Sequence, residues 1–143
     1  MIYLLRHGDA EDGNGDDSAR RLTSKGARQA RDAGRALVAL DLGIDSCLAS
    51  PKRRAAETAS LACGALGIEP ETAPELSDGA FDSLALAAGR GDVLLVGHEP
   101  GFSAEVARLT GANVKLRKGG LAIVDGSTLQ ALLRPADLRR IAA

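Results

Sequence analysis

Short continuous runs of apolar residues alternate along the chain with longer segments in which apolar residues recur every three or four positions. Three of the short runs have the pattern of strands buried on both faces of a parallel sheet, and they span residues 2–5, 45–50 and 92–97. Two further runs, 121–124 and 128–133, flank the dipeptide Asp125-Gly126, which is typical of a two-residue hairpin turn. The pattern predicts a mostly parallel sheet with an antiparallel hairpin at its edge.

Helices are predicted between these strands. The first begins after Thr23, a residue suited to capping, and its buried stripe consists of Ala30, Ala33, Leu37 and Leu40. The second has Pro51 in its first turn, ends at Gly67 and buries Ala55, Ala59, Ala62, Cys63 and Leu66. A third covers about residues 101–109 and ends at Gly111. Strands that alternate with helices predict a three-layer α/β/α sandwich.

Length and composition indicate one soluble globular domain. The chain has 143 residues, which is the usual size of one domain, and 45% of them are hydrophobic and 26% are charged. Arg6 interrupts the apolar start of the chain, which is too short for a signal peptide or a membrane span. We therefore expect a cytoplasmic protein made of a single domain, residues 1–143, with no membrane contact.

Charge and aromatic content argue against nucleic acid as a partner. The 18 Lys and Arg residues are balanced by 19 Asp and Glu residues, and the formal net charge is −1. Tyr3, Phe81 and Phe102 are too few for a base-stacking surface. Cys47 and Cys63 lack the spacing of a zinc site, so we expect both to be small buried side chains. The segment 9–17, rich in Asp and Gly, predicts a mobile acidic loop.

The two histidines of the chain both lie where a predicted strand ends. His7 follows the first strand, and His98 follows the strand at 92–97. Ligands of open parallel sheets bind beyond the carboxyl ends of the strands, so we expect the two rings to lie together although 91 positions separate them. The strand at 45–50 runs into Lys52, Arg53 and Arg54, which brings cations to the same edge.

The residues at this edge are suited to binding phosphate. Arginines stand at two of these strand ends, and their planar guanidinium groups match phosphate oxygens in pairs; the start of a helix adds backbone N–H groups. Two histidines without regular partner spacing make a poor metal site, so we expect no metal and no cofactor. A neutral imidazole is a competent nucleophile near pH 7, and arginines supply the charge neutralisation that phosphoryl transfer needs. A phosphate-sensing module without catalysis is the alternative.

The order of these motifs resembles that of the histidine phosphatase superfamily, also called the phosphoglycerate mutase-like fold. Residues 20–26 (RRLTSKG) are similar to the family's Arg-Pro-Leu-Thr-x-x-Gly stretch, and Glu57-Thr58 stands where Gln-Thr is usual. Only residues 68–91 separate the second block from the late histidine, which leaves no room for the large helical cap of bigger members. This compact form, the opening Arg6 to Ala10 and the triplet Pro74-Glu75-Leu76 resemble SixA-type phosphohistidine phosphatases.

The resemblance implies a role for each matching residue. His7 is the expected nucleophile, Arg6 and Arg54 hold the phosphoryl oxygens, and His98 donates a hydrogen bond to the transferring group. The expected cycle is a double displacement in which His7 attacks phosphorus and is later freed by water. One ring nitrogen of His7 must then be unprotonated, while the other is held by an acceptor such as a backbone carbonyl.

Two parts of the expected site stay open. Arg20 matches the family's arginine and is expected to bind phosphate, but Arg21 replaces a proline, so either arginine could point inward. The general acid has three candidates, of which Glu75 in the Pro-Glu-Leu triplet is preferred over Asp9 and Glu99. Imidazole departs more readily than an alkoxide, so a site without an acid favours a phosphohistidine substrate.

The resemblance therefore implies a metal-independent phosphatase that acts on phosphohistidine in a partner protein. A short chain without a cap is expected to have a shallow pocket, which admits a protein surface more readily than it selects a metabolite. A phosphomonoesterase for a small phosphorylated metabolite is the alternative. The sequence leaves the oligomeric state open, and it is compatible with a monomer.

Overall fold

The computed structural model describes residues 1–143 and contains one six-stranded sheet in the order β3-β2-β4-β1-β5-β6. The strands are β1 (Ile2–Arg6), β2 (Ser46–Ala49), β3 (Pro70–Thr72), β4 (Val93–Gly97), β5 (Leu121–Asp125) and β6 (Thr128–Leu133). Strands β1 to β4 are parallel to one another, whereas β5 runs antiparallel to β1, and β6 antiparallel to β5. The predicted parallel sheet with an edge hairpin is confirmed.

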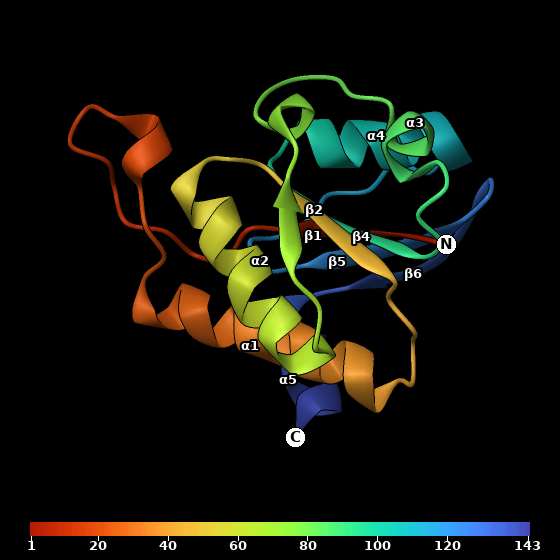
Figure 1. Ribbon diagram of the computed structural model, residues 1–143, viewed down its shortest axis with the longest axis horizontal. Helices are drawn as coiled ribbons and strands as arrows, with labels where there is room; N and C mark the ends of the chain where they lie inside the picture. The colour runs from red at the N-terminus through yellow and green to blue at the C-terminus, as the bar shows by residue number, and fades with distance from the viewer.

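Helices cover both faces of this sheet (Figure 1). On one face lie α1 (Ser24–Ala39), α2 (Arg53–Leu66) and α5 (Pro135–Ala142), and on the other lie α3 (Ser83–Ala87) and α4 (Gly101–Thr110). Short 3₁₀ turns cover Asp17–Ala19 and Pro74–Leu76. No helix is both long and apolar enough to span a membrane. The predicted three-layer α/β/α sandwich without a large helical cap is confirmed.

The continuous apolar runs are explained by the two cores that flank the sheet. Successive side chains of a strand point to opposite faces. In β1, Tyr3 and Leu5 pack with the α1, α2 and α5 side, whereas Ile2 and Leu4 pack with the α4 side. Both faces of β1 are therefore buried, and an alternating polar pattern would leave polar groups in one of the cores.

Two predicted positions in the helices are wrong. Leu40 is 42% exposed because it is the C-cap residue of α1, past the last turn that packs on the sheet. Pro51 precedes α2, which has Lys52 as its N-cap and begins at Arg53. The Ser50 hydroxyl accepts a hydrogen bond from the Lys52 backbone N–H (3.2 Å), and this local turn delays the helix.

The predicted pattern also omits strand β3 and the helices α3 and α5. Strand β3 has only three residues, and two of them are exposed, so it lacks an apolar run. Helix α5 has eight residues and packs one fully buried residue, Leu138, beneath the sheet. Short elements of this kind carry too few apolar positions to establish a period.

Candidate active site

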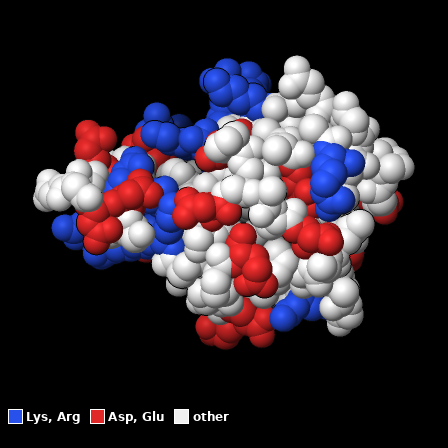
Figure 2. Space-filling model, turned by 90° about the horizontal axis from the view of Figure 1, so that it is seen from above, with Lys and Arg blue, Asp and Glu red and all other residues white.

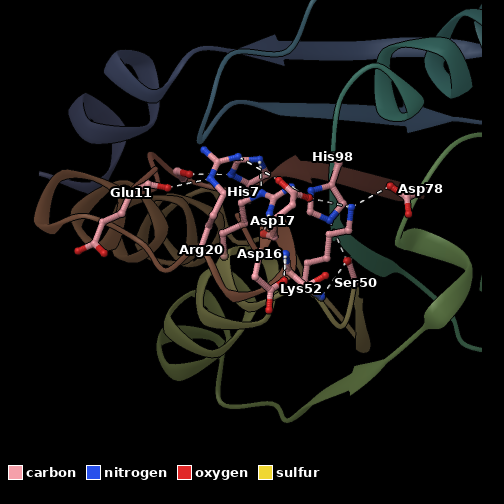
Figure 3. Close-up of polar contacts among 12 residues, drawn as sticks. His7, Glu11, Asp16, Asp17, Arg20, Ser50, Lys52, Asp78 and His98 are labelled. Atoms are coloured by element: carbon pink, nitrogen blue, oxygen red, sulfur yellow. Dashed lines mark hydrogen bonds and ion pairs between the residues drawn. The ribbon is translucent and has the colours of Figure 1, made fainter. Parts of the chain in front are cut away.

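The two histidines face each other at the carboxyl edge of the sheet. Strands β1 and β4 are parallel neighbours in which Arg6 lies opposite Gly97, so the residues that follow them are adjacent. The ring centroids of His7 and His98 are 5.3 Å apart, with the ring planes tilted by 53°. Figure 3 shows the two rings amid Ser50, Lys52 and the acidic loop. The structure thus brings together the two rings that the strand ends predict to be close.

The tautomer of His7 follows from its hydrogen bond. Nδ1 of His7 lies 2.7 Å from the carbonyl oxygen of Gly8, and a carbonyl can only accept, so Nδ1 carries the proton. Burial lowers the pKa of His7 to about 4, and the positive charges of Arg54, Arg6 and Lys118 also lower it, against the opposing effect of the Gly8 hydrogen bond. At neutral pH the ring is uncharged and Nε2 is unprotonated, with its lone pair accepting a long hydrogen bond from Nε of Arg54 (3.4 Å).

The loop that carries His7 is fixed on α1 and α2. A Cβ atom on Gly8 would lie 2.6 Å from the carbonyl oxygen of Gly26 in α1, so only glycine allows this close approach. The Gly8 backbone N–H donates to Oγ1 of Thr58 (3.1 Å), and the same hydroxyl donates to the carbonyl of Arg54 (2.7 Å). Thr58 therefore sets the nucleophile loop against the first turn of α2.

Arg54 points its guanidinium group at the nucleophile. Its Nε lies 3.4 Å from Nε2 of His7, and its side chain is only 7% exposed. Its other two nitrogens donate to the acidic loop, Nη1 to the carbonyl oxygen of Asp17 (2.8 Å) and Nη2 to its carboxylate (3.2 Å). The guanidinium group of Arg54 is thus held in one orientation, with Nε directed to Nε2 of His7, the atom expected to receive a phosphoryl group.

Two of the predicted site residues contain buried polar atoms without a protein partner. These atoms are Nε of Arg6 and Nδ1 of His98. The Arg6 side chain is otherwise anchored by a hydrogen bond from Nη1 to the carbonyl oxygen of Leu116 (3.0 Å). Buried polar groups are nearly always paired in folded proteins. Unpaired buried atoms in two residues of this cluster are consistent with a site built to receive an anion.

His98 is held by Ser50, the first residue after β2. Nε2 of His98 and Oγ of Ser50 are joined by a hydrogen bond of 2.8 Å. The pKa of His98 is lowered to about 3, chiefly by burial and also by the neighbouring His7, Arg54 and Lys52, against the opposing effect of Asp78. His98 is therefore also neutral at pH 7. Ser50 was not among the predicted site residues, although it belongs to a predicted motif.

The acidic loop after β1 reaches back to the cations of the site through Asp17. The carboxylate of Asp17 accepts hydrogen bonds from Lys52 (3.2 Å) and Arg20 (3.3 Å) in addition to that from Arg54. The Lys52 contact is the chief cause that holds the pKa of Asp17 at about 2. Figure 2 shows acidic and basic side chains interleaved at the end of the molecule that carries this loop. The predicted loop is present, but Asp17 ties it to the site.

Arg20 is the arginine of the pair 20–21 that turns inward. Its Nε donates to the carbonyl oxygen of Glu11 (2.7 Å), and its Nη1 reaches the Asp17 carboxylate. Arg21 is 59% exposed and pairs with the carboxylate of Glu11 (3.3 Å). Arg20 thus approaches the site through Asp17 and does not touch either histidine. The spacing Asp17-x-x-Arg20 was the sequence signal for this contact.

The structure does not bring Glu75, the preferred acid, to the histidine pair. Its side chain is exposed on the turn Pro74–Leu76 and lines hollows beside Ala85 and Leu86, whose linings do not include either histidine. Asp9 accepts a hydrogen bond from the Thr23 hydroxyl (2.8 Å) on the α1 side. Glu99 accepts two hydrogen bonds from Ser103 in the first turn of α4. Of the three candidate acids, only Glu99 lines a hollow with His98, and its carboxylate is engaged by Ser103.

Asp78 is a second carboxylate, besides Glu99, on the His98 side of the site. It lines a small hollow with His98, and it pairs with Lys52 (2.8 Å), which also binds Asp17. Its side chain is 81% exposed. Lys52 therefore links the two carboxylates at the mouth of the site. The triplet Pro74-Glu75-Leu76 predicts Glu75, whereas Asp78, three residues later, is the residue of this segment that lines a hollow with His98.

Comparisons with known proteins agree with this geometry. The sequence pattern of the histidine phosphatase superfamily (branch 1) matches residues 2–85. A protein of Picosynechococcus sp. without an assigned function is 36% identical over 134 residues, which cover 84% of this chain and 81% of that protein. More than half of the chain thus matches one family.

Solved structures share the whole fold. The protein histidine phosphatase SixA complexed with tungstate has a TM-score of 0.82 at 26% identity, covering 96% of this chain and 98% of that chain. A SixA structure from Agrobacterium tumefaciens also has a TM-score of 0.82 at 26% identity, with coverage of 94% and 97%. An Escherichia coli protein described as an alpha-ribazole-5'-P phosphatase, 19% identical with a TM-score of 0.75 and coverage of 95% and 98%, shares the fold. The chain therefore belongs to branch 1 of the histidine phosphatase superfamily, in its compact SixA-type form, and is a phosphatase.

Proposed function

We propose that this phosphatase removes the phosphoryl group from phosphohistidine in a partner protein, with His7 as the nucleophile. The observation that carries the proposal is the hydrogen bond between Nδ1 of His7 and the Gly8 carbonyl oxygen. It leaves an unprotonated Nε2 opposite the guanidinium group of Arg54, and the low pKa of His7 keeps that nitrogen free at neutral pH. A buried neutral imidazole beside fixed cations is suited to attack a phosphoryl group.

In the proposed first step, Nε2 of His7 attacks phosphorus, and the bond from phosphorus to the leaving nitrogen breaks. Arg54 and Arg6 neutralise the charge on the phosphoryl oxygens, and His98 donates a hydrogen bond to one of them. Because the Ser50 hydroxyl already accepts from the Lys52 N–H, its own proton can be donated to Nε2 of His98. The neutral His98 ring then has its proton on Nδ1, the buried atom without a protein partner.

In the second step, water attacks the phosphorylated His7. Nε2 of His7 departs as the leaving group with its lone pair, and inorganic phosphate is released. The water supplies the fourth oxygen and the protons of the released phosphate, His7 returns to its neutral form and His98 stays neutral throughout, so the protein is unchanged at the end of the cycle. The charge neutralisation in both steps comes from arginines, and the proposed mechanism therefore needs no metal.

The settings of the carboxylates favour phosphohistidine over an ester. Low pKa and ion pairing keep Asp17 ionised at neutral pH, Asp78 is paired with Lys52, and Asp9 and Glu99 accept hydrogen bonds from Thr23 and Ser103. Glu75, predicted to be the acid, would have to move from its exposed turn to reach a leaving group. An alkoxide needs such an acid. A substrate imidazole that carries a proton on its second nitrogen departs as a neutral ring without one.

The test is turnover of a phosphohistidine peptide beside a panel of metabolite esters that includes sugar phosphates and nucleotides. We expect kcat/KM for the peptide to exceed that of every ester, with an acid-labile phosphoryl adduct trapped on His7. Turnover of the esters alone would replace the proposal with the phosphomonoesterase alternative. If no adduct forms and no substrate is hydrolysed, the chain is a phosphate-binding module, and the proposal is wrong.

A further inference from the structure

Charge is unevenly distributed over the molecule despite the balanced composition. Of the 18 Lys and Arg residues of the chain, ten line one groove: Arg6, Lys25, Arg28, Arg31, Arg35, Lys115, Arg117, Lys118, Arg139 and Arg140. The acidic side chains in the same lining are only Asp9 and Asp32. More than half of the cations of the chain are therefore gathered along one path, which we call the basic groove.

One end of the basic groove includes Arg6, a predicted residue of the active site. A hollow of about 570 Å³ lies between Arg6 and residues 115–118, and a second of about 1050 Å³ lies between α1 and α5. The two hollows share Lys25, Gln29 and Pro135, so they form one continuous depression. Helices α1 and α5 lie side by side along it (Figure 1). The groove thus leads from a predicted phosphate-binding arginine to the far side of α1.

Most cations of the groove are exposed and carry free charge. Eight of the ten are exposed, namely Lys25, Arg28, Arg31, Arg35, Lys115, Arg117, Arg139 and Arg140. None of these eight forms an ion pair, whereas the less exposed Lys118 lies 3.8 Å from Asp9. On α1, Arg28, Arg31 and Arg35 are three and four residues apart, so like charges are neighbours on one helix face. An anionic ligand along the groove would relieve this repulsion.

The shape of the groove restricts what can fill it. From Lys25 to Arg35 the groove follows α1 for about 15 Å, at a rise of 1.5 Å per residue, and a small metabolite in the active site cannot reach that far. The lining contains no aromatic residue on which nucleobases could stack. Its apolar members are Leu116, Pro135, Ala136 and Ala143, with no exposed large side chain to enter a bilayer. An acidic polypeptide fits these limits.

We infer that the basic groove docks an acidic segment of the partner protein that flanks its phosphohistidine. The inference rests on the proposed function and adds the chemistry by which the partner is recognised. A phosphohistidine bound between His7 and His98 places the adjoining residues of its chain at the Arg6 end of the groove. Since an extended chain covers about 3.3 Å per residue, acidic side chains several positions from the phosphohistidine reach Arg28, Arg31 and Arg35.

The experiment compares two synthetic peptides that have one phosphohistidine and equal length. One peptide has Glu at about four to eight residues on either side of the phosphohistidine, and the other has Gln at the same positions. At low ionic strength we expect kcat/KM to be about tenfold higher for the Glu peptide, through a lower KM, because steering by opposite charge acts on association. The advantage should fall as salt shortens the Debye length.

The variant Arg31→Glu/Arg35→Glu is expected to abolish or reverse the preference for the Glu peptide. The matched control is Arg21→Glu/Arg90→Glu, which changes net charge equally at two exposed cations outside the groove and should keep the preference. Thermal unfolding of both variants checks that they are folded. The readout is a ratio of two kcat/KM values in one protein, so a general loss of activity does not imitate the expected result.

The outcomes separate the two proposals. Equal kcat/KM for both peptides in the wild-type protein, or a preference that survives in the groove variant, overturns the groove inference and leaves the proposed function intact. Hydrolysis of metabolite esters but of neither peptide overturns the proposed function itself. Equal use of the peptides, with groove-dependent binding of phosphatidylserine vesicles or a single-stranded oligonucleotide, would assign the groove to another polyanion and overturn the inference.

Discussion

Arg54 in the active site and Arg31 in the basic groove are both arginines on helices, but they are placed in opposite ways. The side chain of Arg54 is only 7% exposed, and its nitrogens are directed to His7 and Asp17. Arg31 is exposed and has no ion-pair partner. A buried and oriented guanidinium group can act on individual oxygen atoms, whereas an exposed one acts through its charge over a distance. The burial and orientation of an arginine therefore indicate whether it takes part in the reaction, as we propose for Arg54, or in binding the partner, as we propose for Arg31.

Replacing the nucleophile should give the largest difference between the two regions, because it should abolish turnover in the active site and leave peptide binding to the basic groove unchanged. We expect His7→Ala to lower kcat by about 10⁴-fold or more, because no other group can form the covalent intermediate. The acid-labile adduct should disappear at the same time. Binding of the Glu-flanked peptide in its unphosphorylated form should stay within about twofold of wild type, since the groove is untouched. A His7→Ala protein that still turned over at a tenth of the wild-type rate would contradict the assignment of the nucleophile.

A pair of Arg-to-Lys exchanges compares the two regions directly. We expect Arg54→Lys to lower kcat by about 10²- to 10³-fold, because an ammonium group cannot present two fixed donors to the phosphoryl oxygens. Arg31→Lys keeps the charge of the groove and should change kcat/KM for the Glu-flanked peptide by less than about twofold. Steady-state kinetics of both variants provides the measurement. Equal effects of the two exchanges would remove the distinction between oriented and diffuse positive charge.

The parts of the fold and the site that could be predicted from the sequence are those that local sequence patterns determine. The apolar runs of β1 and β4 and the position of each histidine after its strand are local features, and they were sufficient to place His7 opposite His98. The family resemblance added Arg54, and the structure directs its guanidinium group at His7. Sequence-adjacent signals thus accounted for the centre of the site and for the layers of the fold.

The rest of the site depends on contacts between segments far apart in the chain. Asp17 meets Lys52 across 35 positions, and no periodicity or motif in the acidic loop indicates that it folds back onto the site. The short turn around Pro74–Leu76 decides whether Glu75 or Asp78 approaches His98, and a shift of three residues reverses the answer. Such orientations are set by tertiary packing of loops, which hydrophobic patterns do not describe.

Acidification should lower the stability of the protein through the two histidines of the active site, and not through the cations of the basic groove. In the folded protein the pKa of His7 is about 4 and that of His98 about 3, both below the ordinary value of 6.5. The unfolded chain therefore binds more protons as the pH falls below 6.5, and stability is lost through that window. The loss between pH 6.5 and pH 5 is on the order of 2 kcal/mol for each histidine, whereas Lys and Arg in the groove do not titrate there.

Urea unfolding at pH 7 and pH 5 measures this difference. The variant His7→Asn, which has no titrating ring, should lose less stability than wild type over that interval, by on the order of 2 kcal/mol. The exposed-site variant Arg31→Gln should lose as much as wild type. Direct NMR titration of the His7 ring provides an independent check, and a folded-state pKa near 6.5 would contradict the burial that the site requires.

The smallest expected effect concerns Asp17, whose carboxylate makes the cations of the pocket unlike those of the groove. Its negative charge lies beside Arg54 and Lys52 and partly cancels the attraction of the pocket for an anion. Asp17→Asn should therefore tighten inhibition by inorganic phosphate by about three- to fivefold, a modest change because the carboxylate is more than half exposed. Asp12→Asn removes the same charge from the same loop without breaking an ion pair and is the matched control.

The sign of that change distinguishes two roles of the Asp17 contact. If the carboxylate acts mainly by its charge, phosphate binds more tightly in Asp17→Asn and kcat changes little. If the hydrogen bonds of Asp17 are what hold the Arg54 fork toward His7, phosphate binds more weakly and kcat falls as it does in Arg54→Lys. We expect the first result, because Arg54 would keep its bond to the backbone carbonyl of residue 17 and its burial beside His7 when the carboxylate is replaced.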